Sequence, residues 1–137
     1  MIFYHHLYKT HVFQFIVQVW KALSTQVFYI CSMILYNVTV SIDREIEQEW
    51  LEWMRKVHIP EVMETGCFQE CRISRIQGEE DGGSAYSFLY LAPSEEKMEA
   101  YQVRFAPKLQ QDHAMRYQGK FAAFRTMLTV IEEFKAS

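Results

Sequence analysis

The chain has 137 residues, which is enough for one domain with a core of its own. Half of the residues are hydrophobic and 23% are charged, a balance typical of a folded protein. The formal net charge of -3 argues against nucleic-acid binding, which needs a basic surface. Three cysteines are too few for a disulfide framework and indicate a reducing cytoplasm.

Residues 1–32 differ in composition from the rest of the chain. They are apolar and aromatic, with two lysines, no acidic residue, no glycine and no proline. No stretch of them reaches the roughly 18 apolar residues that a membrane span needs. Three interpretations stay open: an upstream start codon with Met33 as the true start, a targeting or anchoring helix, or a loosely packed helical extension. The change in composition predicts a domain over residues 33–134.

The first predicted strand covers residues 33–42, because apolar and mixed residues alternate there. Asp43 is the predicted N-cap of a helix over residues 44–58. The apolar side of that helix repeats at helical spacing and consists of Ile46, Trp50, Trp53, Met54 and Val57. Pro60 predicts that the helix ends or bends near His58.

A short turn over residues 61–65 ends at Gly66, and an edge strand over residues 67–76 follows. An acidic loop then leads to a third strand over residues 84–92. Ser94 is the predicted N-cap of the second helical region, which Pro107 divides into two pieces. Its buried side consists of Met98, Tyr101, Phe105 and Leu109, and a last strand covers residues 120–132.

This order of elements predicts an α+β protein of the ferredoxin-like βαββαβ type. Its sheet is four-stranded and antiparallel, and both helical regions lie on one face. The third and fourth strands are apolar on both faces, so the face without helices needs a cover. A second copy of the chain, packed sheet against sheet, is the predicted cover and makes a homodimer. Residues 1–32 folded back over the sheet are the alternative.

Four residues are candidates for a ligand-binding site between the helices and the sheet. His58 and His113 lie at the end of the first helix and on the buried side of the second, where histidine can act as an acid, a base or a ligand. The alternative is that both are structural histidines, hydrogen-bonded in the core. Arg125 interrupts an apolar strand and can bind a carboxylate or phosphate, pair with an acidic residue, or reach solvent. Tyr101 completes the set.

No metal site and no cofactor are predicted. Cys67 and Cys71 would lie about 13 Å apart on a strand, too far for a disulfide. A zinc site built from these cysteines with His58 and His113 lacks short ligand spacing. The sequence also contains no glycine-rich phosphate loop, no nucleophile elbow and no HExxH motif.

Five blocks of residues, in order, resemble a family of short bacterial proteins known as domain of unknown function 4286. They are Met33-Ile-Leu-Tyr-Asn-Val-Thr-Val, Glu49-Trp-Leu-Glu-Trp-Met, His58-Ile-Pro60-Glu-Val-Met-Glu-Thr-Gly66, Ala106-Pro107-Lys-Leu and Phe121-Ala-Ala-Phe-Arg-Thr126. The resemblance covers residues 33–131. It implies a ferredoxin-like fold related to dimeric α+β barrels, a start at Met33, and no particular activity.

Three functions remain open from the sequence. The first is a small cytoplasmic homodimer that binds a small molecule between helices and sheet. The second is a dimeric-barrel enzyme, monooxygenase-like or isomerase-like, that uses His58 or His113. The third is a structural or regulatory interaction protein. No nucleic acid is expected as a partner, and no membrane unless residues 1–32 are an anchor. A cavity that both histidines face favours the first two, and a filled core favours the third.

Overall fold

The computed structural model of the protein describes residues 14–21, 32–78 and 83–137. Residues 14–21 are helical and their side chains are exposed. The predictions for residues 1–13 and 22–31 concern positions outside the described residues. Within the described ranges, no helix is both long enough and apolar enough to span a membrane. Residues 32–137 form a compact unit of their own.

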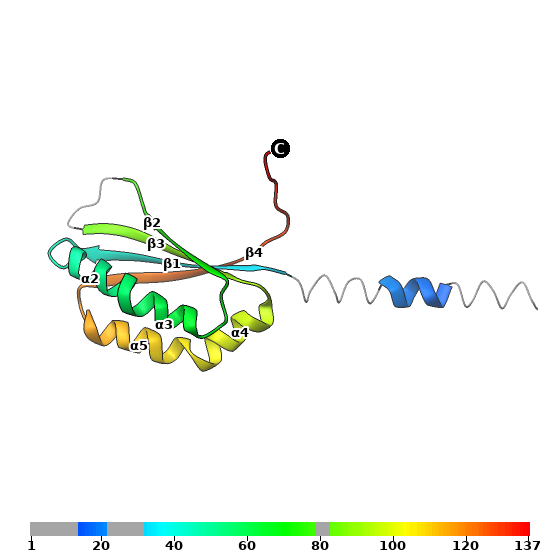
Figure 1. Ribbon diagram of the computed structural model, residues 1–137, viewed down its shortest axis with the longest axis horizontal. Coiled ribbons are helices and arrows are strands. Elements are labelled where there is room, and N and C mark those ends of the chain that lie inside the picture. The colour runs from blue at the N-terminus through cyan, green and yellow to red at the C-terminus, as the bar shows by residue number, and fades with distance from the viewer. Residues whose placement is uncertain (1–13, 22–31, 79–82) are drawn as a thin grey trace, which may run out of the picture. The chain divides into compact units, whose positions relative to one another are not determined.

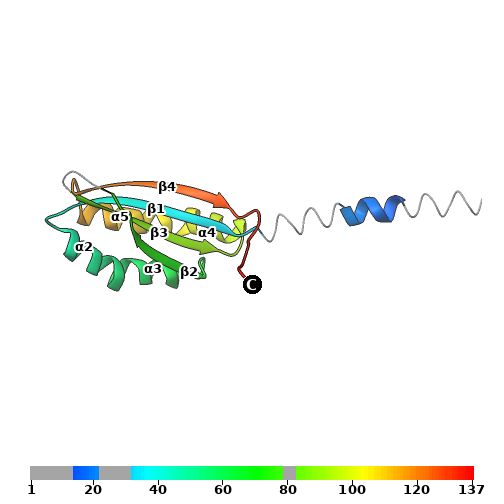
Figure 2. The ribbon, with the colours of Figure 1, turned by 90° about the horizontal axis from the view of Figure 1, so that it is seen from above.

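The sheet has four antiparallel strands in the order β2-β3-β1-β4, which confirms the ferredoxin-like prediction (Figure 2). The first strand is internal and pairs along its length with both neighbours, so that Val38 lies opposite Phe88 on one side and Arg125 on the other. The strand bounds are β1 Ile34–Asp43, β2 Glu70–Arg75, β3 Gly83–Ala92 and β4 Phe121–Thr129. The strands β2 and β4 are shorter than predicted.

The helices of this unit lie on one face of the sheet, as predicted (Figure 1). Ser94 caps the second helical region, because its Oγ accepts a hydrogen bond from the Lys97 backbone N–H at 3.2 Å. Pro107 lies in the first turn of a separate helix, also as predicted. The helical segments are α2 Glu47–Trp53, the π-helix η1 Met54–His58, α3 Ile59–Glu64, α4 Glu95–Arg104 and α5 Ala106–Arg116.

The first helical region begins later than predicted and is interrupted near His58. It begins at Glu47 and not after Asp43, because β1 continues through Asp43, whose backbone N–H bonds to the Lys120 carbonyl. Near His58, where the helix was predicted to end or bend, a π-turn over Met54–His58 interrupts the α-helix, and the helical chain then runs on to Glu64. The backbone N–H of Ile59 donates to the Met54 carbonyl, five residues back, in a π-turn. The wider turn accommodates a proline that has no N–H to donate.

The π-turn decides which side chains face the sheet. A row of buried or half-buried residues four positions apart runs along this region and consists of Trp50, Met54, His58 and Val62. In an α-helix each such step overshoots a full turn by about 40°, so the row would wind away from the sheet. The extra residue in the π-turn compensates and keeps His58 above the sheet. Val57 is 39% exposed, so the prediction that it is buried was wrong.

The sheet has one buried face and one open face. Tyr36, Phe88 and Tyr90 point toward the helices and are almost fully buried. The opposite face is apolar around a polar centre, where the Ser87 hydroxyl donates to Asn37 Oδ1 at 2.6 Å and Asn37 Nδ2 donates to Thr39 Oγ1 at 3.1 Å. None of the helices described in residues 32–78 and 83–137 lies over this open face (Figure 1). The open face carries Leu35, Asn37, Thr39, Ala85, Ser87, Leu89, Leu91, Ala122, Phe124 and Leu128.

Candidate functional site

A small cavity lies between the helices and the buried face of the sheet, and all four candidate residues line it. Measured as the space open to the centre of a water molecule, it holds about 40 Å³. One water needs about 10–15 Å³ by this measure, so the cavity holds a few heavy atoms. Its lining consists of Tyr36, Val38, Val40, Met54, His58, Phe88, Tyr90, Tyr101, Gln110, His113, Ala123 and Arg125.

His58 enters the cavity from the π-turn. Its ring is stacked on Trp53 with centroids 5.2 Å apart and lies 5.7 Å from the ring of His113. Its Nδ1 is buried and has no hydrogen-bond partner among the described residues. Burial lowers the pKa of His58 to about 4, with Asp112 opposing and Arg125 adding to the effect. His58 is therefore neutral at pH 7 and keeps an unpaired nitrogen, which costs about 1–3 kcal/mol.

His113 reaches the same cavity from α5. Its Nε2 accepts a hydrogen bond from the indole Nε1–H of Trp50 at 2.9 Å. Burial, together with the nearby His58 and Arg125, lowers the pKa of His113 to about 4. A neutral imidazole that accepts at Nε2 carries its proton on Nδ1, so the hydrogen-bond network assigns a donor there. The two histidines are thus not equivalent, since only His113 has a partner in the core.

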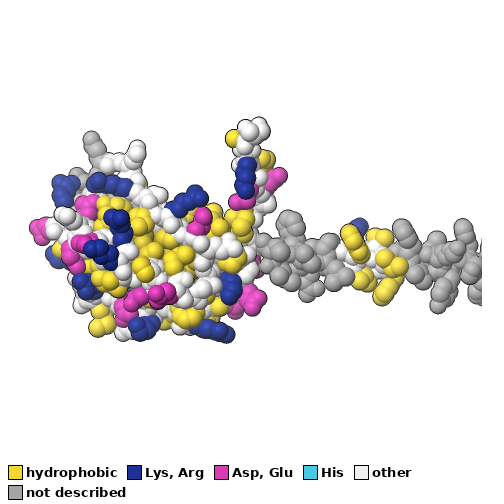
Figure 3. Space-filling model, viewed as in Figure 1, with side chains coloured by type: hydrophobic (Ala, Val, Ile, Leu, Met, Phe, Trp, Pro, Cys, Tyr) yellow, Lys and Arg dark blue, Asp and Glu magenta, His cyan; other side chains and the backbone are white. Residues whose placement is uncertain are grey.

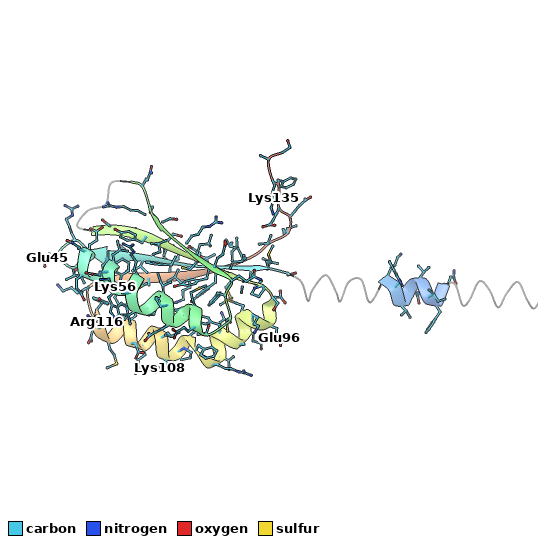
Figure 4. The ribbon with its side chains drawn as sticks, viewed as in Figure 1. Glu45, Lys56, Glu96, Lys108, Arg116 and Lys135 are labelled. Carbon is cyan, nitrogen blue, oxygen red and sulfur yellow. The ribbon has the colours of Figure 1, made fainter. Side chains whose placement is uncertain are left out.

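The helices that carry the histidines are tied together on their outer side. The guanidinium of Arg116 on α5 lies 2.9 Å from Glu49 Oε1 on α2, and the Tyr117 hydroxyl donates to the same oxygen at 3.1 Å. Figure 4 shows Arg116 at the end of α5 that lies next to α2. Arg116 also lies over the Trp53 ring, 5.4 Å from its centroid. These contacts fix Trp53, on which His58 stacks.

Arg125 lies on β4 at the boundary of the cavity. Its side chain makes no ion pair with a carboxylate in the described part of the chain. Burial raises the pKa of the Tyr36 hydroxyl, and Arg125 and Gln110 oppose this by charge and hydrogen bonding. The same three residues border a larger outer groove of about 430 Å³, which Gln102, Ala106, Pro107 and Met127 complete. Cavity and groove therefore meet at Arg125.

The remaining polar groups of the cavity stay protonated. Burial raises the pKa of the Tyr101 hydroxyl on α4 and of the Tyr90 hydroxyl on β3. Burial also raises the pKa of the nearby Cys71 thiol to about 11, which makes it a poor nucleophile. Among the described residues, no three His, Cys, Asp or Glu side chains gather as metal ligands do. The chemistry of the site is that of neutral rings, hydroxyls, the Gln110 amide and one guanidinium.

Three residues of this site were not predicted from the sequence. Trp50 was assigned to the core and not as the donor to His113, 63 residues away. Tyr36 was placed on the apolar face of its strand, and Gln110 was not considered. The spacing of four residues between buried positions before Pro60 is a sequence signal for the π-turn. No local sequence pattern, in contrast, predicts the contact between Trp50 and His113.

Comparisons with known proteins agree with this fold. The model of a family described as domain of unknown function (DUF4286) matches residues 33–131. The comparison with curated proteins finds no match. Two solved structures described as dimeric ferredoxin-like proteins, each from an uncultured marine organism, are similar to this chain. One is 14% identical with a TM-score of 0.58 and covers 76% of this chain and 99% of its own. The other is 11% identical with a TM-score of 0.58 and covers 75% and 99%.

A third similar structure is a monooxygenase of Streptomyces coelicolor in complex with nanaomycin D. It is 14% identical with a TM-score of 0.53, and the match covers 77% of this chain and 94% of that one. At these identities the likeness shows a shared fold and nothing about a shared reaction.

Proposed function

This chain belongs to the DUF4286 family, and we propose that it is a cytoplasmic homodimer that binds a small molecule between its helices and its sheet. One observation carries the proposal: His58 Nδ1 is buried at a cavity without a hydrogen-bond partner among the described residues. Natural proteins pair nearly all buried polar atoms with protein groups or with bound molecules. A ligand that bonds to His58 accounts for a polar atom that the fold itself leaves unpaired.

Binding is better supported than the two alternatives. An enzyme that uses His58 or His113 for proton transfer near pH 7 works best with a pKa close to 7, and both histidines have a pKa near 4. A purely structural protein would have both histidines satisfied in a filled core. Only His113 has a partner of this kind, the indole of Trp50.

The open face of the sheet supports a second copy as its cover. Phe124 is 64% exposed and Leu128 is 47% exposed on it, and its polar centre of Ser87, Asn37 and Thr39 is bonded internally. Polar groups that bond to one another lose less when water is removed, so the centre can be covered at low cost. The two marine proteins of the same fold are described as dimeric, which adds support.

Two further features bear on location and partners. Cys67 and Cys71 are free thiols, which suits a reducing cytoplasm. Acidic and basic side chains are interspersed on the face drawn in Figure 3, which does not resemble the continuous basic surface of a nucleic-acid-binding protein.

Equilibrium dialysis against a bacterial extract of small molecules, followed by mass spectrometry, tests the binding proposal. Ala123→Phe fills the cavity from β4, and Val103→Phe adds the same side chain on the outer side of α4, where Val103 is 71% exposed. We expect the wild type and Val103→Phe to enrich the same compounds and Ala123→Phe to lose them. Enrichment that Ala123→Phe keeps, or no enrichment by the wild type, contradicts the proposal. Circular dichroism checks that both variants are folded.

A further inference from the structure

The cavity presents hydrogen-bond donors in excess of acceptors. Arg125 has donors only, the buried tyrosine hydroxyls keep their protons, and His113 carries its proton on Nδ1 because Nε2 accepts from Trp50. Among the described residues, no aspartate or glutamate lines the cavity or the outer groove. Among the described residues, the acidic group that acts on the pKa of His58 is Asp112, which pairs with Lys108 at 2.9 Å. A molecule that satisfies this lining brings acceptor atoms, and a negative charge fits best.

Arg125 is the group that would bind this charge. It lies opposite Val38 on the helix-facing side of β4, and it is exposed where the cavity meets the outer groove. No carboxylate of the described residues pairs with it. Charge-assisted bonds from a guanidinium to a carboxylate are among the strongest in proteins.

The sizes of the inner cavity and the outer groove indicate a ligand with two parts, a small polar head and a larger apolar body. The inner cavity, about 40 Å³ by the water-centre measure, takes a group of about three heavy atoms, since one water needs about 10–15 Å³. A carboxylate has this size. The outer groove is about ten times larger, at about 430 Å³, and Ala106, Pro107 and Met127 give it apolar walls. The body of the ligand therefore lies outside the cavity, against an apolar surface.

We infer that the ligand is an organic acid whose carboxylate enters the cavity between Arg125 and His58 and whose apolar body lies in the groove along Ala106, Pro107 and Met127. In this arrangement the carboxylate accepts hydrogen bonds from Arg125 and from the protonated nitrogen that His58 then presents at Nδ1. The inference deepens the proposed function and rests on it. It excludes neutral ligands and inorganic phosphate as the preferred occupants.

Methyl NMR of the full-length protein, labelled with 13C in its methionine methyl groups, tests the inference. Met54 lines the inner cavity and Met127 the outer groove, so their signals report the head and the body separately. The probes are hexanoate and its uncharged counterpart hexanamide. We expect hexanoate to shift both signals and to bind about 10- to 100-fold more tightly than hexanamide, as a charged hydrogen bond allows.

Arg125→Gln should abolish the preference for hexanoate. The matched control is Arg55→Gln, which removes the same charge from an exposed position on η1 and should leave the preference unchanged. Equal binding of the acid and the amide by the wild type, or a preference that Arg125→Gln retains, overturns the inference and leaves the proposed function standing. No shift of Met54 with hexanoate also overturns it. The proposed function fails separately, when dialysis enriches no compound.

Discussion

Glutamate at both Phe124 and Leu128 will convert the proposed homodimer into monomers and raise its dissociation constant by about 100-fold or more. Both side chains lie on the open face of the sheet and are 64% and 47% exposed in the single chain. In a symmetric dimer both copies carry both substitutions, so four carboxylates must lose their water close to one another at the interface. Analytical ultracentrifugation over a range of protein concentrations measures the change.

The control places the same charges on the helical side of the molecule. Val103 on α4 and Met115 on α5 are each 71% exposed, and glutamate at both should leave the dimer intact. A Phe124→Glu, Leu128→Glu double variant that stays dimeric at the concentration where the wild type is dimeric would show that the interface lies elsewhere. A wild type that is monomeric throughout would rule out the homodimer.

Lowering the pH from 6.5 to 4 will reduce the free energy of unfolding by about 4 kcal/mol. The pKa of His58 and of His113 is lowered from 6.5 to about 4 in the folded protein by burial. Between these values the unfolded chain binds protons that the folded protein does not, so unfolding is favoured as the pH falls. A pKa difference of about 2.5, counted in full for both histidines, would give a loss larger than about 4 kcal/mol. Solvent at the mouth of the cavity screens the two charges and reduces the loss. Urea unfolding at several pH values measures the effect.

His58→Met separates the histidines from the carboxylates in this experiment. The variant keeps one buried histidine, so the loss of stability between pH 6.5 and 4.5 should be about half that of the wild type. The hydrogen bond of Tyr86 lowers the pKa of Glu47, and its contribution is lost only near and below the ordinary glutamate pKa. A wild type whose stability is flat between pH 6.5 and 5, or a variant with an undiminished slope, would contradict the buried neutral state of His58.

The order of strands and helices could be predicted because each element carries local chemistry of its own. Alternation in residues 33–42 marks an internal strand, Ser94 offers an oxygen to an open helix end, and Pro107 cannot continue a helix. The same reasoning located the four candidate residues at one cavity, since His113 and Tyr101 share the buried side of the second helical region. These predictions depend on spacing along the chain, which the fold preserves.

The details of the site depend on contacts that spacing does not encode. A helix period of 3.6 puts Val57 toward the sheet, and the π-turn before Pro60 puts His58 there instead. Trp50 was predicted to be buried and is, but its bond to His113 joins two helices that only the fold brings together. Which histidine is left without a partner, and hence which one is free for a ligand, follows from that single tertiary contact.

The free energy of unfolding of ligand-free His58→Met at pH 7.5, compared with the wild type, tests most directly whether His58 serves binding and not folding. Methionine fills a similar volume, packs well against the Trp53 ring and removes the unpaired Nδ1. We predict that the free energy of unfolding rises by about 1 kcal/mol, because the substitution removes an unsatisfied polar atom from the core. The interaction that it gives up is the one with the ligand, which is absent in this measurement. A loss of about 2 kcal/mol or more would mean that His58 stabilises the fold, as a structural histidine does, and would contradict the account.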